Sequence, residues 1–237
     1  FLLIRPPPRS TLFPYTTLVR SFAAFREAYA TAFSGFYLAF MLLLFALIFR
    51  AVSMEFRSKR DSAAWRGFFD VCFCGASTLA ALLFGVAVGN CIKGVPIGAD
   101  HELHISLLAL LTPYPVLVGL FTVAMFAMHG SIYLYLKTTG DLQERIHGWM
   151  WRTFGIFLVL YLLTTIYSLV QIPNATRNFN EHPWVWVVVV LNVLAIANIP
   201  RAIYLSRPFY AFISSSASIP AFVFLFGVAL YPDLLVS

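Results

Sequence analysis

Long apolar segments alternate with short polar segments along most of the chain. A helix needs about 20 mostly apolar residues to cross a hydrocarbon core about 30 Å thick. Segments of this length that lack the strict alternation of a barrel strand predict helices. Six such helices are predicted, at Tyr29–Phe49, Phe68–Asn90, Pro115–Leu136, Thr153–Val170, Trp184–Leu205 and Phe209–Tyr231. The predicted fold is therefore an all-α, polytopic membrane helix bundle.

The composition supports a membrane protein and excludes several other classes. The 237 residues are 60% hydrophobic and 11% charged, where soluble globular chains are about 45–50% apolar and about 25% charged. The chain has too little polar surface for a soluble enzyme or a nucleic-acid-binding module. Its net charge of +6 is typical of basic residues that fix membrane topology, so no nucleic-acid partner is expected.

Basic residues are distributed unevenly among the segments between the predicted helices. In chain order, these segments hold five, one, three, one and two Lys or Arg residues. Basic segments remain on the cytoplasmic side of a membrane. The first helix is therefore predicted to enter from the outside, and the segment that carries Glu55 is predicted to face the cytoplasm.

Residues 1–21 differ from the rest of the chain. The segment does not begin with Met, contains the triplet Pro6–Pro8, and includes a stretch similar to translated sequencing-adaptor DNA. Three prolines do not fit inside a spanning helix. We expect residues 1–21 to be a non-native or disordered leader and residues 22–237 to form the membrane domain.

Charged residues near the predicted helix ends are the first candidates for function. Arg50 closes the first apolar segment, and Glu55 is the one acid among several bases that follow it. These residues indicate either a solvated connection that anchors topology or a functional site, because charges at membrane depth are rare. Asp70 is predicted to be an interfacial carboxylate near a helix N-terminus.

Histidine, asparagine and cysteine residues supply further candidates. His129, deep in the third predicted helix, is compatible with a haem ligand, a proton relay or a hydrogen-bonded core residue. His101 and His104 are expected in a solvated segment. Asn90 is predicted to end its helix with its amide on backbone carbonyls, and Asn192 and Asn198 to bond neighbouring helices. Cys72, Cys74 and Cys91 are interpreted as small buried residues.

The order of several motifs resembles subunit II of the cytochrome bd quinol oxidases. The motifs are Ala32-Phe33-Ser34-Gly35-Phe36-Tyr37, Glu55-Phe56-Arg57-Ser58-Lys59, Gly85-Val86-Ala87-Val88-Gly89-Asn90, Lys137-Thr138-Thr139-Gly140-Asp141-Leu142 and Gly227-Val228-Ala229-Leu230-Tyr231-Pro232. The resemblance extends from about Phe22 to the end. Members of the family have about nine spans, so the chain is expected to be a fragment that lacks helices at both ends.

The resemblance implies a terminal oxidase of the bacterial inner membrane that oxidises quinol and reduces oxygen to water. Such an enzyme draws protons from the cytoplasm and releases protons outside without being a true pump. The resemblance places haem b and haem d, or haem b only, in the partner, subunit I, so this chain is expected to ligate none. Quinol and membrane lipid are further expected partners, and some members bind a structural quinone in subunit II.

The same resemblance implies roles for individual residues. Glu55 matches a family carboxylate, usually Asp, that is associated with a cytoplasmic proton route. Arg50 matches a basic residue just before it, where a positive charge favours the ionised carboxylate. Ser58 is a candidate hydrogen-bonding neighbour. The alternative function is a secondary transporter or permease, which usually shows paired breaks in two related halves.

Overall fold

The computed structural model describes residues 33–94, 107–172 and 183–231. Every regular element in these ranges is helical, which confirms the all-α fold. The elements are α3 (Tyr37–Arg57), α4 (Ala63–Lys93), α5 (Leu107–Leu110), α6 (Pro113–Lys137), α7 (Asp141–Gln171), α9 (Val185–Tyr204) and α10 (Pro208–Leu230). The predicted leader (1–21) and the pair His101 and His104 lie outside the described residues.

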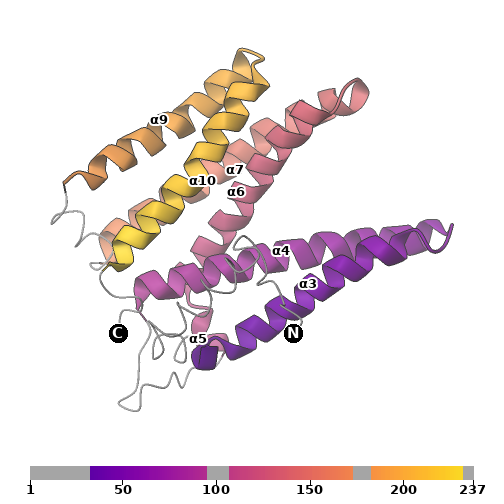
Figure 1. Ribbon diagram of the computed structural model, residues 1–237, viewed down its shortest axis with the longest axis horizontal. Coiled ribbons are helices and arrows are strands. Elements are labelled where there is room, and N and C mark those ends of the chain that lie inside the picture. The colour runs from indigo at the N-terminus through magenta and orange to yellow at the C-terminus, as the bar shows by residue number, and fades with distance from the viewer. Residues whose placement is uncertain (1–32, 95–106, 173–182, 232–237) are drawn as a thin grey trace, which may run out of the picture.

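Six of these helices are long and apolar enough to cross a membrane. They form three antiparallel hairpins, α3–α4, α6–α7 and α9–α10, each joined by a connection of a few residues. Figure 1 shows the hairpins spreading apart toward their three tight turns. Helix α6 is central, because it packs against α4, α7 and α10. The prediction of a six-span polytopic bundle is therefore confirmed.

Several helices are longer than their apolar segments. Helix α7 begins at Asp141, whereas the hydrophobic pattern placed its start at Thr153. Helix α3 continues to Arg57, so Glu55 is helical and not in a connecting segment. The physical reason is that hydropathy marks only the part of a helix that crosses hydrocarbon, whereas the backbone hydrogen bonds continue into the polar interface.

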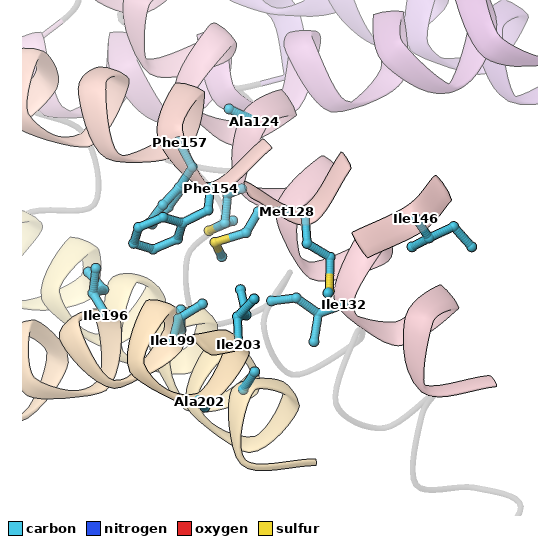
Figure 2. Packing of buried hydrophobic residues seen from close by; sticks show 13 residues of the cluster. Ala124, Met128, Ile132, Ile146, Phe154, Phe157, Ile196, Ile199, Ala202 and Ile203 are labelled. Atoms are coloured by element: carbon cyan, nitrogen blue, oxygen red, sulfur yellow. The ribbon is translucent and has the colours of Figure 1, made fainter. Parts of the chain in front are cut away.

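The main hydrophobic core lies between α6, α7, α9 and α10. Its fully buried members include Met128 and Ile132 of α6, Phe157 of α7 and Ile199 of α9. Figure 2 shows these side chains directed toward one another from three helices. Close packing of this kind holds membrane helices together, because lipid tails are as apolar as the side chains and supply no hydrophobic driving force.

Glycines bring α4 and α6 into direct contact. A methyl group added at Gly85 would lie 2.6 Å from the Cα of Gly119, and one added at Gly89 would lie 2.6 Å from the Cα of Pro115. Both distances are below any real carbon contact. Only the absence of a side chain permits this approach, which is the usual role of small residues between membrane helices.

Candidate functional site

Glu55 lies in the last turn of α3, on an exposed part of the helix. Its carboxylate pairs with Lys59, with 3.2 Å between Oε1 and Nζ, and both side chains are more than half exposed. This spacing of four residues places the two groups on the same face. The site therefore presents a carboxylate with one nearby base to its surroundings.

The structure does not bring Arg50 and Ser58 to that carboxylate. Arg50 precedes Glu55 by five residues, which separates the two side chains by about 140° around the helix. The guanidinium of Arg50 instead lies over the ring of Phe73 in α4, 5.6 Å from its centroid. The Ser58 hydroxyl donates to the backbone carbonyl of Glu55 at 3.4 Å, so this contact holds the end of the helix and does not involve the carboxylate.

Asp70 makes an ion pair that sequence reasoning missed. Arg57 Nε lies 2.5 Å from Asp70 Oδ1, and Arg57 Nη2 lies 3.2 Å from Oδ2. The pair is bidentate and joins the end of α3 to α4. The prediction that Asp70 lies near a helix N-terminus is wrong, because α4 begins at Ala63 and Asp70 lies about two turns later, beyond the reach of the helix dipole.

A tryptophan and two phenylalanines strengthen the same junction. Trp65 donates its indole N–H to the backbone carbonyl of Phe56 at 2.9 Å. Phe69 stacks on Phe56 with 6.2 Å between ring centroids, and Trp65 meets Phe69 edge-on at 4.9 Å. The last turn of α3 is thus tied to the first turns of α4 by charged, hydrogen-bonding and aromatic contacts.

His129 makes a hydrogen bond inside the bundle. Its Nδ1 lies 3.0 Å from the hydroxyl of Ser215 in α10, and its ring stacks on Phe212. Because Ser215 donates its own hydrogen to the carbonyl of Phe212, Nδ1 of His129 is the donor. The geometry shows the hydrogen bond expected of a core residue and is equally compatible with the other two alternatives, because this bond does not use Nε2. In the part of the chain that the structure describes, no three His, Cys, Asp or Glu residues gather as a metal site would require.

The predicted bonds of Asn90 and Asn198 are confirmed, but Asn90 does not end its helix, because α4 continues to Lys93. The buried amide of Asn90 donates to the backbone carbonyls of Val86 and Leu110, each at 2.9 Å. Asn198 donates to the hydroxyl of Ser214 at 2.9 Å and so links α9 to α10. Asn192 was predicted to bond a neighbouring helix in the same way, but its buried Oδ1 has no hydrogen-bond partner among the described residues.

Asn192 lies on a large cavity between α4, α6, α7, α9 and α10. The cavity has a volume of about 640 Å³ and is mostly apolar, with lining side chains that include Phe84, Phe121 and Phe222. Its polar groups include Thr164, whose Oγ1 also has no partner among the described residues. Nothing in the hydrophobic pattern indicated this cavity, because it depends on how the hairpins pack.

The fold and these sites define a polytopic helical membrane protein with a polar hairpin end and an open, mostly apolar cavity between its helices. The family model for cytochrome bd terminal oxidase subunit II matches residues 16–237. The chain belongs to that family.

Individual relatives agree with this assignment. The chain is 28% identical to cytochrome bd-I ubiquinol oxidase subunit 2 of Escherichia coli (strain K12), over 91% of this chain and 65% of the relative. It is 28% identical to the probable cytochrome oxidase subunit 2 of Haemophilus influenzae, with the same coverage. It is 29% identical to cytochrome bd ubiquinol oxidase subunit 2 of Bacillus subtilis, over 91% of this chain and 63% of the relative. The chain therefore covers less than two thirds of the length of each of these relatives.

Proposed function

We propose that the chain is part of subunit II of a cytochrome bd-type terminal oxidase, which oxidises quinol and reduces oxygen to water in a bacterial inner membrane. Family membership over residues 16–237 carries this proposal. The proposed partner is subunit I, which would hold haem b and haem d, or haem b only. When bound there, the haems supply electron transfer from quinol to oxygen.

The assignment of the haem ligands to the partner rests on the family to which the chain belongs. A haem iron needs an axial ligand such as a histidine nitrogen, and the Nδ1–H bond of His129 to Ser215 does not decide this point, because it does not use Nε2. Among the described residues, no group of three His, Cys, Asp or Glu side chains could hold a metal ion. In this proposal the chain supports its partner and ligates no haem itself.

Within this complex, Glu55 is proposed to collect protons from the cytoplasm. Its carboxylate is exposed beyond the apolar part of α3 and pairs with Lys59 at 3.2 Å. The group would take a proton from cytoplasmic water and pass it toward the site of oxygen reduction. Arg50 would add positive charge from the other side of the helix, and Ser58 would hold the carbonyl of Glu55.

Substitution of Glu55 in the assembled oxidase tests this role. Glu55→Gln removes the titratable group and keeps the size of the side chain, so oxygen uptake with a quinol should slow while haem content stays normal. The matched control is Glu144→Gln, which changes an exposed acid near the start of α7 and should leave uptake unchanged. Full oxygen uptake in Glu55→Gln would show that the carboxylate is only a solvated surface group.

The cavity supports a second proposal, that the chain holds a structural quinone. A cavity of about 640 Å³ lies within the size range of small-molecule sites, which are mostly apolar with a few polar groups. Asn192 and Thr164 are among its lining residues, and each has a buried side-chain oxygen without a hydrogen-bond partner among the described residues. A buried unpaired polar atom costs about 1–3 kcal/mol. These two residues are the candidates to bond the polar ring of a quinone, and the aromatic side chains would contact its tail.

Quinone extraction tests this second proposal. Asn192→Leu should reduce the amount of quinone that co-purifies with the oxidase, measured by chromatography of the organic extract. Asn198→Leu is the control, because Asn198 lies on the same helix but bonds Ser214 and does not line the cavity. An unchanged quinone content in Asn192→Leu would exclude that residue as part of the site.

The alternative, a secondary transporter or permease, makes a different prediction for membranes. Deletion of the gene should abolish a quinol-dependent part of oxygen uptake if the chain is an oxidase subunit. Unchanged oxygen uptake, together with the loss of uptake of a solute, would favour the transporter.

A further inference from the structure

The last turn of α3 is attached to α4 by contacts that act in different directions. The two hydrogen bonds from Arg57 to Asp70 restrain the direction of the Arg57 side chain. The bond from the Trp65 indole to the carbonyl of Phe56 restrains the backbone. Phe69 adds aromatic contact with both Phe56 and Trp65. Together these contacts restrain both the position and the rotation of this turn.

A second ion pair in the same hairpin provides a comparison. Arg66 Nη2 lies 2.5 Å from Asp61 Oδ1, but this pair uses a single oxygen and joins the connection to the start of α4. The Asp61 side chain is 97% exposed, against 53% for Asp70. Exposed single contacts contribute little to stability, whereas bidentate Arg–carboxylate pairs also fix geometry. The Arg57–Asp70 pair is therefore the one that orients α3.

We propose that Arg57, Asp70 and Trp65 form a positioning clamp for Glu55. Arg57 and Glu55 are two residues apart, so their side chains are separated by about 160° around the helix. A contact that holds Arg57 against α4 therefore holds the Glu55 carboxylate on the side of α3 that α4 leaves open. The three clamp residues act through the orientation of Glu55, and this proposal rests on the proposed role of Glu55 in proton entry.

Hydrogen exchange tests the geometric part of the clamp. Asp70→Asn removes the charge and keeps the size of the side chain, and Trp65→Phe removes the indole N–H and keeps an aromatic ring. In the assembled oxidase, each should accelerate amide exchange in a peptide that contains residues 50–59. Asp61→Asn, the matched control, should leave that exchange unchanged. If residues 50–59 exchange no faster in Asp70→Asn and Trp65→Phe than in Asp61→Asn, the clamp is wrong.

A double-mutant cycle tests whether the clamp acts through Glu55. Asp70→Asn alone should slow quinol-driven oxygen uptake roughly three- to tenfold at normal haem content, as expected for coupled residues. In the Glu55→Gln background, the same change should have no further effect. The exchange Arg57→Asp with Asp70→Arg should restore uptake, because it rebuilds the ion pair.

The outcomes separate this inference from the proposed function. If Glu55→Gln itself leaves oxygen uptake unchanged, the role of Glu55 in proton entry is wrong. If Glu55→Gln slows uptake but Asp70→Asn has no effect, or has an effect that simply adds to that of Glu55→Gln, the positioning clamp is wrong. Loss of haem or of the partner subunit in Asp70→Asn, without rescue by the exchange, would assign the pair to assembly only.

Discussion

The α3–α4 hairpin and the α6–α7–α9–α10 bundle hold their helices in different ways. In the most apolar stretch of α6, 44% of the residues are buried inside the protein, whereas in α3 only 11% are buried. Helix α3 is still strongly apolar, and its outward side chains include Leu44, Phe45 and Phe49. Its polar contacts to α4 are concentrated at the end that carries Arg57.

This difference shows that apolar composition does not decide which membrane helix is internal. Lipid accepts apolar side chains as readily as a protein core does, so position in the bundle depends on packing and polar contacts. Helix α6 is internal because Gly119 admits α4 and because Met128 and Ile132 meet neighbouring helices. Helix α3 is peripheral in this chain: it packs along α4, and its ion pair to α4 lies at its end.

A large core side chain gives the largest expected difference between the two regions. Phe157 is fully buried in the bundle, and Phe157→Ala should lower the stability of the complex by about 3–5 kcal/mol. Phe45→Ala, at a side chain of α3 that is 52% exposed, should have a much smaller effect. The measurement is the midpoint of heat inactivation in detergent. Equal losses for the two variants would show that a neighbouring subunit packs against α3 as tightly as the core packs around Phe157.

Substitution at the glycine contact between α4 and α6 should have the next largest effect on stability. Gly85→Ala places a methyl group against the Cα of Gly119 and the side chain of Thr122, so we expect a loss of about 1–3 kcal/mol from overpacking. Gly155→Ala is the control on α7, where the added methyl meets nothing within 4 Å. Alanine is favoured over glycine in a helix by about 0.5–1 kcal/mol, so the control should be neutral or stabilising. The two variants should therefore move the heat-inactivation midpoint in opposite directions or by clearly different amounts.

Asn90 tests a buried polar contact at the other end of α4. Asn90→Ala removes both of its hydrogen bonds to backbone carbonyls and should cost about 1–3 kcal/mol, since the carbonyl of Leu110 loses its donor. Asn198→Ala removes one bond to a hydroxyl and should cost less. If Asn90→Ala is as stable as the natural chain in the same heat-inactivation assay, the contact between α4 and α5 does not contribute to the stability of the complex.

His129 gives the smallest expected effect on stability and a sharp spectroscopic test. His129→Ala removes a hydrogen bond to Ser215, which is worth about 1 kcal/mol. The reduced-minus-oxidised spectrum should retain every haem band. The disappearance of one band would place a haem ligand in this chain and would overturn the assignment of all ligands to the partner.

Much of this fold could be predicted from the hydrophobic pattern, because segments long enough to span a membrane are unmistakable. The bonds of the Asn90 amide to backbone carbonyls were also predictable, since a buried amide needs partners, although α4 continues past Asn90 to Lys93. The start of α7 was missed because residues 141–152 are polar but still helical. The separation of Arg50 from Glu55 was missed for the same reason: the apolar segment ended at Phe49, so the continued helix was treated as a connection.

Other features needed the folded chain. The Arg57–Asp70 pair depends on the register between two antiparallel helices, and residue spacing alone does not set that register. The cavity on which Asn192 and Thr164 lie depends on five helices together. Local sequence therefore indicated which residues were polar, whereas the packing of hairpins determined which of them meet.

Purification of the intact gene product from its own membranes tests the oxidase assignment most directly. A tagged product should be isolated gently, and its reduced-minus-oxidised spectrum should be recorded together with the identity of the co-purifying chains. We predict haem bands and a second, larger multi-span subunit. A colourless preparation without such a partner would contradict the assignment.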